Sequence, residues 1–328
     1  LRWQSDGIRF FAPLSGVLLG LMLFLRIDGL LPIIVVTGGI LLATTVGQRG
    51  SWSFFAALAL PLLFAVPYLN GPMRAYTTYP REFIANLHTW QHIAIGLGTF
   101  AAAAALFAAR QSASIREGLL RWVPLLCTLL IVVAGLYALF FREPAGKLAA
   151  HDAYALRMFA NFYVTVPVVL AALLGYAVYA RQAFWRSPTF FLVVAAFGLF
   201  FFYKLRIVPE HFWAARRFVP VLLPATLILA SAAAVGGRGF GSWPVRAGRM
   251  LIGIVLLALV GSHYARASAP VADYVEFAGV VPQVEELAAQ IRDDDLLIVE
   301  SRDAGGDIHI VGLPLAYIYA RNVLVLNS

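Results

Sequence analysis

Three polar segments between apolar runs gather arginines, lysines, acids and histidines, the side chains that bind anions and transfer protons. The segments are Asn70–Trp90, Phe141–Met158 and Tyr203–Pro220. A guanidinium group pairs with two phosphate oxygens at once, so this mixture predicts recognition of a substrate with a phosphate group. The candidate residues for holding that group are Arg216, Arg217, Lys204, Arg206, Arg26, Arg74 and Arg81. For each arginine taken alone, the competing interpretation is a side chain that reaches from a helix end to the lipid headgroups.

Two of these segments also contain an acid next to a histidine. The pairs are His151–Asp152 and Glu210–His211, and such groups orient a substrate hydroxyl or carry a proton in acid–base catalysis. Neighbouring side chains point in different directions on a helix, so spacing alone does not make either pair a catalytic dyad. We include both pairs among the candidate substrate-binding residues.

Other motifs favour structural roles. His88 and His92 would share one face of a helix, a spacing that can bind a metal ion. A third ligand is not evident in the sequence, so we interpret them as interfacial histidines beside Trp90 and predict no metal site. We interpret Asp293–Asp295 and Asp303–Asp307 as turns; the second lacks the Lys-Ser/Thr ending of a phosphate loop. No cofactor is indicated, and the sequence leaves a divalent metal ion open.

The elements that must position these residues are apolar runs long enough to cross a membrane. Hydrophobic residues make up 61% of the chain and charged residues 13%, which excludes a soluble globular body. A spanning helix needs about 20 mostly apolar residues. We predict an all-α polytopic membrane bundle of about nine spans, at residues 10–25, 30–46, 52–69, 91–109, 119–141, 158–180, 189–205, 216–235 and 248–265. The basic residues in its loops indicate a membrane surface as their partner, and not nucleic acid.

The composition changes abruptly at Pro270. Residues 1–269 contain 22 Lys and Arg against 7 Asp and Glu, whereas residues 270–328 contain 3 against 10. We therefore expect a transmembrane helical body over 1–269 and a small soluble α/β domain over 270–328. The elements expected in this domain are helices at 281–293 and 314–321 and strands at 295–301 and 322–327. The apolar strands predict a parallel sheet covered on both faces. We expect the chain to be a fragment of a longer protein, with this domain truncated.

The orientation follows from the loops. With nine spans, and with Arg2 and Arg9 in the cytoplasm, the C-terminal segment lies outside. Compact basic linkers such as Arg110–Arg121 are typical of cytoplasmic loops, and the three polar segments would then meet at the opposite surface. Lys and Arg divide almost evenly between the two sides, so the positive-inside rule adds little. We predict a multi-pass protein of a bacterial-type inner (plasma) membrane with an extracytoplasmic C-terminal segment.

Two spans and the terminal domain resemble membrane glycosyltransferases of the GT-C superfamily. The run Gly16–Pro32 (GVLLGLMLFLRIDGLLP) is similar to a small-residue-rich span of the aminoarabinose transferase and protein O-mannosyltransferase group. His211–Leu229 (HFWAARRFVPVLLPATLIL) resembles their late span with an arginine, an aromatic residue and spaced prolines. A small α/β segment after the last span is typical of many of these enzymes. The resemblance covers most of the chain and corresponds to the C-terminal portion of such an enzyme.

The resemblance implies transfer of a sugar from a polyprenyl-phosphate carrier in the membrane to an extracytoplasmic glycan, lipid or protein. In this superfamily the general base is an acid of the first outer loop, which would precede Gly16. We therefore expect the base upstream of residue 1 and assign it to no residue here. The alternatives are a transporter or flippase and an O-antigen ligase-like membrane protein. A transporter would favour mid-span charges and broken helices, whereas charges here cluster at span ends.

Overall fold

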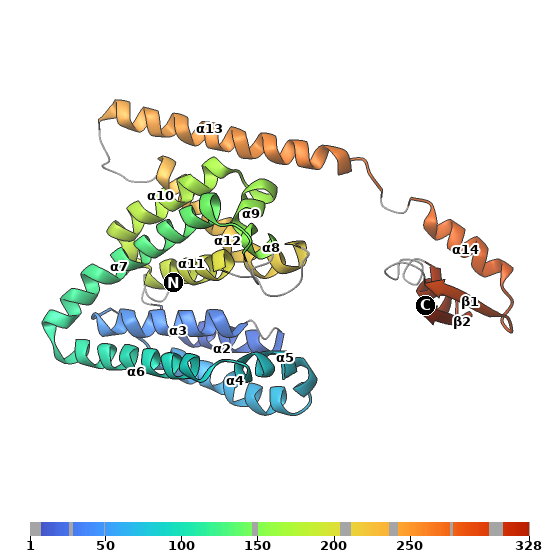
Figure 1. Ribbon diagram of the computed structural model, residues 1–328, viewed down its shortest axis with the longest axis horizontal. Helices are drawn as coiled ribbons and strands as arrows, with labels where there is room; N and C mark the ends of the chain where they lie inside the picture. Colours follow the sequence, from blue (N-terminus) through green and yellow to red (C-terminus); the bar gives the residue numbers. More distant parts are fainter. Residues whose placement is uncertain are drawn as a thin grey trace. The chain divides into compact units, whose positions relative to one another are not determined.

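The computed structural model describes residues 8–25, 29–48, 50–145, 150–203, 211–235, 242–275, 278–301 and 311–327 (Figure 1). The chain divides into two compact units, Leu1–His263 and Tyr264–Ser328. In their described parts, the first unit consists of helices that are mostly apolar, and the second contains short helices and two paired strands.

Unit 1 is built from helices joined mostly by short connections. In chain order they are α2 (Phe11–Leu25), α3 (Leu30–Thr45), α4 (Trp52–Asn70), α5 (Arg74–Ala85), α6 (Thr89–Gln111), α7 (Ala113–Leu136), α8 (Ala150–Ala153), α9 (Ala155–Tyr163), α10 (Val166–Ala183), α11 (Pro188–Tyr203), α12 (His211–Val235) and α13 (Trp243–Ser268). A π-helix (Tyr137–Phe141) continues α7 without a break. Helix α13 runs across the boundary between the two units.

Within the described residues, five helices are long and apolar enough to cross a membrane. They cover Trp52–Asn70, Thr89–Gln111, Ala113–Phe141, Val166–Arg186 and Trp243–Val271. Four shorter apolar helices cover Phe11–Leu25, Leu30–Thr45, Pro188–Phe202 and Val219–Val235. The predicted membrane-spanning helical body is therefore present, whereas the count of about nine spans is not confirmed.

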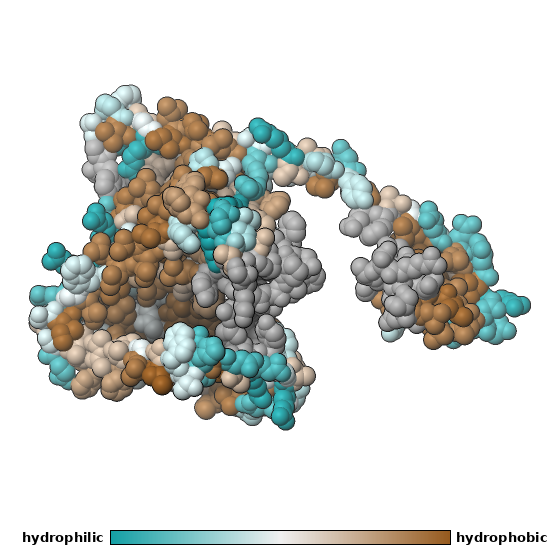
Figure 2. Space-filling model, viewed as in Figure 1, coloured by the Kyte–Doolittle hydropathy of each residue, from teal (hydrophilic) through white to brown (hydrophobic). Residues whose placement is uncertain are grey.

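Large apolar side chains of this body face outward. Phe100 on α6 and Leu257 on α13 are each 73% exposed, and many others share this exposure. Figure 2 shows hydrophobic residues over much of the visible surface of unit 1. An apolar surface this continuous is unfavourable in water, so it indicates a lipid environment.

Glycines allow pairs of these helices to pack closely. A Cβ at Gly16 of α2 would overlap the carbonyl oxygen of Phe54 on α4. A Cβ at Gly175 of α10 would likewise overlap the carbonyl oxygen of Leu229 on α12. Small residues at such contacts let two backbones approach, which favours helix association in lipid. The larger buried cluster of apolar side chains surrounds the α10–α12 contact.

The span predicted at 158–180 is wrong as a single helix. Helix α9 ends at Tyr163 and α10 begins at Val166, and Val164 and Thr165 between them have nonhelical backbone conformations. Pro167 explains the break. It has no N–H to bond to the Tyr163 carbonyl, and its ring would clash with that carbonyl in a continuous helix, whereas proline is tolerated in a first turn. The break makes α9 a short separate helix that packs against α10, α11 and the π-helix.

The segment Asn70–Trp90, predicted only as a polar connection between two spans, contains helix α5. Pro72 precedes this helix, and α5 continues through position 80. Polar and apolar residues alternate in α5 with helical spacing, and this pattern was the better signal.

Unit 2 contains a small parallel sheet within its described residues. Its elements are α14 (Val280–Gln290), β1 (Leu296–Ser301), α15 (Leu313–Tyr317) and β2 (Asn322–Asn327). The two strands pair in parallel, with Leu296 opposite Asn322 and Ser301 opposite Asn327. The predicted strands and their parallel direction are therefore confirmed. The predicted turn at Asp303–Asp307 lies outside the described residues.

The described helices of unit 2 cover one face of this sheet. Leu297 packs in a cluster with Val284 of α14 and Leu315 of α15. Leu296 and Ile298 point to the opposite face by strand alternation, and they are 61% and 57% exposed. Within the described part, only one face of the sheet is covered by helices, so the prediction that both faces are covered is wrong.

Candidate functional site

Four polar residues lie where the helix made by α7 and its π-helical end meets α9, and the side chains of Glu143, Tyr154 and Arg157 contact one another. We call Arg142, Glu143, Tyr154 and Arg157 the Arg157 cluster. Arg142 and Glu143 directly follow the π-helix, Tyr154 directly precedes α9, and Arg157 lies in the first turn of α9. π-Helical turns inside α-helices occur frequently at functional sites.

Arg157 is held by three partners, two of them inside the cluster. Its Nε donates a hydrogen bond to the Leu139 carbonyl at 2.8 Å, and its Nη1 donates to Oε1 of Glu143 at 3.1 Å. Its guanidinium carbon lies 4.9 Å from the centre of the Tyr154 ring, within the range of a cation–π interaction. A guanidinium has five N–H donors, and these two hydrogen bonds use two of them. Donors are therefore left for a further anionic group.

Glu143 is fixed by both of its oxygens. Oε2 accepts a hydrogen bond of 2.6 Å from the Tyr154 hydroxyl, and Oε1 accepts from Arg157. The hydrogen bond from Tyr154, followed by that from Arg157, lowers the pKa of Glu143. The same bond raises the pKa of Tyr154, because the phenol proton is shared with a carboxylate. Glu143 is thus an ionised carboxylate at neutral pH that neutralises one charge of the cluster.

Two charged side chains of this region, one inside the cluster and one outside it, are buried. Arg142 is 7% exposed, and its Nη1 donates a hydrogen bond to the Phe202 carbonyl at the end of α11. Asp152 on α8 is 1% exposed and stands two residues before Tyr154. Buried charges in a membrane protein are costly to maintain, so they mark candidate functional positions.

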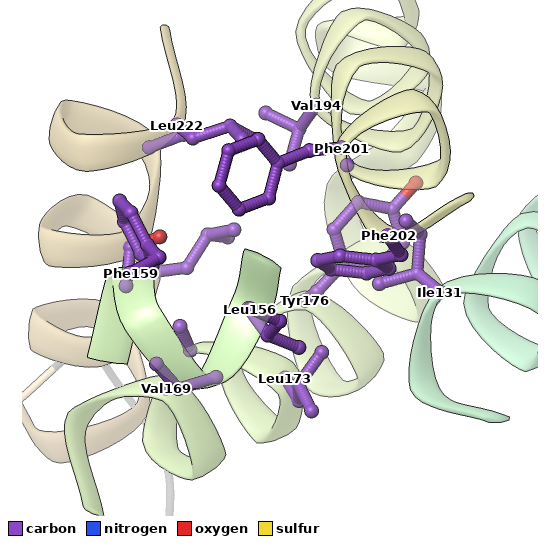
Figure 3. Close-up of a pocket in the computed structure, with 15 residues that line it drawn as sticks. Ile131, Leu156, Phe159, Val169, Leu173, Tyr176, Val194, Phe201, Phe202 and Leu222 are labelled. Carbon is purple, nitrogen blue, oxygen red and sulfur yellow. The ribbon is translucent and has the colours of Figure 1, made fainter. Parts of the chain in front are cut away.

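An apolar pocket lies among α7, α9, α10, α11 and α12. Its empty volume is about 500 Å³, part of it open to the outside. The residues that line it are Ile131, Leu156, Phe159, Val169, Ala172, Leu173, Tyr176, Val194, Gly198, Phe201, Phe202, Leu222, Ala225, Thr226 and Leu229. Figure 3 shows the rings of Phe159 and Phe201 and the side chains of Leu156 and Leu222 arranged around it. The hydroxyl of Tyr176 donates to the Phe191 carbonyl at 3.0 Å, so the pocket suits a hydrocarbon chain.

The pocket and the Arg157 cluster are neighbours. Phe202 lines the pocket, and its carbonyl accepts the hydrogen bond from Arg142. Leu156 also lines the pocket and directly precedes Arg157 on α9. An apolar cavity and an arginine-bearing cluster therefore share α9 and the end of α11.

The substrate-binding residues predicted from sequence are distributed over several elements. His211, Arg216 and Arg217 belong to α12, and their side chains lie outside the described part of the structure. The predicted residues Arg26, Lys204, Arg206 and Glu210 also lie outside it. His151 belongs to α8, and its side chain is also outside the described part. The next residue, Asp152, is two positions before Tyr154 of the Arg157 cluster in the sequence.

Arg74 and Arg81 occupy a different place, on the exposed helix α5. Arg81 donates a hydrogen bond to the side-chain oxygen of Asn70 at the end of α4. Arg74 begins α5 and is exposed. These two predicted residues therefore lie on α5, with Arg81 bonded to the end of α4, and neither of them lines the pocket.

The members of the Arg157 cluster were not singled out from the sequence. All four belong to the polar segment Phe141–Met158, but the segment was read for its His151–Asp152 pair. A usable signal was the spacing of Tyr154 and Arg157, which are three residues apart and so share a helix face. The partners Leu139 and Phe202 accept through backbone carbonyls, which no residue type indicates.

His88 and His92 lie at the start of α6. The backbone N–H of His88 donates to Oε1 of Gln91 at 2.9 Å, which caps the first turn of the helix. Among the described residues, no group of three or more His, Cys, Asp or Glu side chains could hold a metal ion.

The chain was compared with protein-family models, curated proteins and solved structures, and none of them matches. The class of this protein therefore rests on its own sequence and structure. It is a membrane-spanning helical protein with a small α/β unit, and its helical body contains an apolar pocket beside a charged cluster.

Proposed function

We propose that this protein is a membrane glycosyltransferase that moves a sugar from a polyprenyl-phosphate carrier to an extracytoplasmic acceptor. The observation that carries the proposal is the shared border of the apolar pocket and the Arg157 cluster at Phe202 and α9. A polyprenyl-phosphate donor has two corresponding parts, a long hydrocarbon chain and an anionic head. The reaction type comes from the resemblance of Gly16–Pro32 and His211–Leu229 to the GT-C superfamily.

In the proposed complex, part of the hydrocarbon chain occupies the pocket and the phosphate lies beside Arg157. The acceptor oxygen forms a bond to the anomeric carbon of the sugar, and the bond from that carbon to the phosphate oxygen breaks. The carrier phosphate leaves with the electron pair, and the acceptor proton passes to a general base, a role that we assign to no residue here. A guanidinium beside the leaving group lowers the barrier, because it stabilises the negative charge that develops there.

Arg157 suits this role because its position is fixed before a substrate binds. The Leu139 carbonyl and Glu143 accept from two nitrogens of the guanidinium, and further N–H donors remain on it among the described residues. A prepositioned charge costs little reorganisation when the reaction occurs. The predicted residues Arg216 and Arg217 belong to the second turn of α12, the helix that supplies Leu222 to the same pocket, and they stay proposed phosphate ligands.

A flippase for a lipid-linked sugar is the second candidate. The observation that favours it is the break between α9 and α10 within an apolar run, because broken helices are typical of transporters. A flippase would use the same pocket and cluster to hold its cargo without breaking the sugar–phosphate bond. An O-antigen ligase-like protein is a further alternative from the sequence.

The test is a transfer assay with the protein in vesicles that contain a polyprenyl-phosphate sugar. We expect release of polyprenyl phosphate in wild type and a ten- to hundredfold slower release in Arg157→Gln, since a charge-assisted hydrogen bond contributes about 1.5–3 kcal/mol. Arg121→Gln is the control. It also removes one arginine charge, but Arg121 lies on α7 over the Trp122 ring, does not line the pocket and is not a member of the Arg157 cluster. Movement of the lipid across the bilayer without cleavage would identify the flippase instead.

A further inference from the structure

Helix α5 is confined to a membrane surface by its neighbours in the chain. It lies between α4 and α6, and both of these are long and apolar enough to cross a membrane. The connections Gly71–Met73 and Asn86–His88 have three residues each, and three residues reach about 10 Å at most. Helix α5 itself has 12 residues, about 18 Å of helix, which is too short to cross the ~30 Å hydrocarbon core. It therefore lies close to the boundary where α4 ends and α6 begins.

The polar side of α5 is attached to the end of α4. Thr77 is 5% exposed, and its hydroxyl lies 3.2 Å from the Leu69 carbonyl oxygen. Arg81 donates to the side chain of Asn70. These contacts use carbonyl and amide groups at the end of a helix, where backbone acceptors lack partners inside the helix. They hold α5 at one fixed place beside the end of α4.

The side of α5 next to Thr77 and Arg81 is apolar in sequence, and two of its side chains are exposed. In the sequence of this helix, aromatic or apolar residues recur at positions 76, 79, 80, 83 and 84, which lie together on one side of a helix with 3.6 residues per turn. Tyr76 is 48% exposed and Ile84 is 54% exposed. A short helix with one polar and one apolar side is suited to the interface of a bilayer.

Aromatic residues at the ends of both neighbouring spans mark the same boundary. Tyr68 in the last turn of α4 is 37% exposed, and Trp90 in the first turn of α6 is 65% exposed. Tyrosine and tryptophan are enriched where membrane spans meet the headgroups. We propose that α5 is an interfacial helix, with Tyr76 and Ile84 inserted at the boundary between headgroups and acyl chains and with Arg74 among the headgroups.

The proposal is tested by the accessibility of single labelled positions on α5. The full chain carrying Cys127→Ser would receive Tyr76→Cys or Ile84→Cys, be labelled with an environment-sensitive fluorophore and be placed in vesicles of equal phosphatidylcholine and phosphatidylglycerol. Thr78→Cys is the control, because Thr78 is exposed on the polar side of the same helix. Fluorescence would be quenched with nitroxide-labelled lipid and, separately, with aqueous iodide.

We expect positions 76 and 84 to be quenched severalfold more by nitroxide lipid than position 78, and iodide to give the opposite order. Two variants on the apolar side keep the test valid if one of them does not fold. Iodide quenching at 76 and 84 equal to that at 78 would place α5 in water and overturn the proposal. Protection of both positions from both quenchers would also overturn it, because a protein surface would then cover them. Neither outcome depends on the proposed transferase reaction.

Discussion

The Tyr154 hydroxyl donates a hydrogen bond to the Glu143 carboxylate, with 2.6 Å between the two oxygens. Glu143 accepts from Arg157 through its other oxygen, so one carboxylate joins the residue before α9 to the first turn of that helix. Arg157 in turn binds the Leu139 carbonyl in the π-helix. The position of Arg157 in the proposed phosphate site therefore depends on the hydrogen bond between Tyr154 and Glu143, two residues that need not contact the substrate themselves.

Removal of this hydroxyl should change the response of the protein to acid. We expect Tyr154→Phe to raise the pKa of Glu143 toward its ordinary value, because the Tyr154 hydrogen bond is the main cause of its lowering. A lowered carboxylate pKa stabilises the folded protein above the ordinary value of about 4.3, and this stabilisation is lost as the pH falls through the lowered pKa. The thermal midpoint of Tyr154→Phe should therefore fall less than that of wild type on acidification from pH ~5 to ~3.

Tyr274→Phe is the control for this experiment, because Tyr274 lies in unit 2 and is 66% exposed. Its thermal midpoint should follow that of wild type at every pH. The same acid response in Tyr154→Phe and wild type would mean that the hydrogen bond to Glu143 does not form in solution.

The close contact of α10 and α12 should not tolerate a methyl group. In Gly175→Ala the new Cβ would overlap the Leu229 carbonyl oxygen, and backbone cannot move aside as a flexible side chain can. Overpacking of this kind costs about 1–3 kcal/mol, so the thermal midpoint in detergent should fall by several degrees. Gly96→Ala on α6 is the matched control, since its Cβ would meet no atom within 4 Å. Equal midpoints for the two variants would contradict the described packing.

A bulky side chain in the apolar pocket should exclude a lipid chain. Ala172 lines the pocket and is 7% exposed, so Ala172→Phe places a ring where we propose the hydrocarbon to lie. We expect at least a tenfold weaker affinity for polyprenyl phosphate, measured by native mass spectrometry. Leu174→Phe on the same helix is the control, because Leu174 is 59% exposed and does not line the pocket. Loss of binding in the control but not in Ala172→Phe would place the lipid elsewhere.

The apolar runs predicted the helical body well, because the need to satisfy every backbone group in lipid leaves few structures other than helices. The break at Val164–Thr165 was missed, although Pro167 stands two residues after it. An apolar run in the sequence does not show whether a proline begins a new helix or bends an existing one. Helix α5 was missed because Asn70–Trp90 was interpreted as a polar connection, and its helical spacing was not considered.

The candidate site was predictable only as a region. The sequence placed Arg142, Glu143 and Arg157 in one polar segment, and no periodicity indicates that Arg142 would reach the carbonyl of Phe202, 60 residues later. The pocket depends on five helices that pack side by side, which no single segment encodes. The preferred candidates Arg216 and Arg217 have side chains outside the described residues, so their role stays a prediction.

The central claim is that the pocket and the Arg157 cluster bind the two parts of one lipid phosphate. The most direct measurement compares the affinity of the purified protein for polyprenyl phosphate and for the uncharged polyprenol, in wild type and in Arg157→Gln. Wild type should prefer the phosphate by about ten- to hundredfold, as a charge-assisted hydrogen bond of ~1.5–3 kcal/mol implies, and Arg157→Gln should lose this preference while binding the alcohol as wild type does. An unchanged preference for the phosphate in Arg157→Gln would contradict the account.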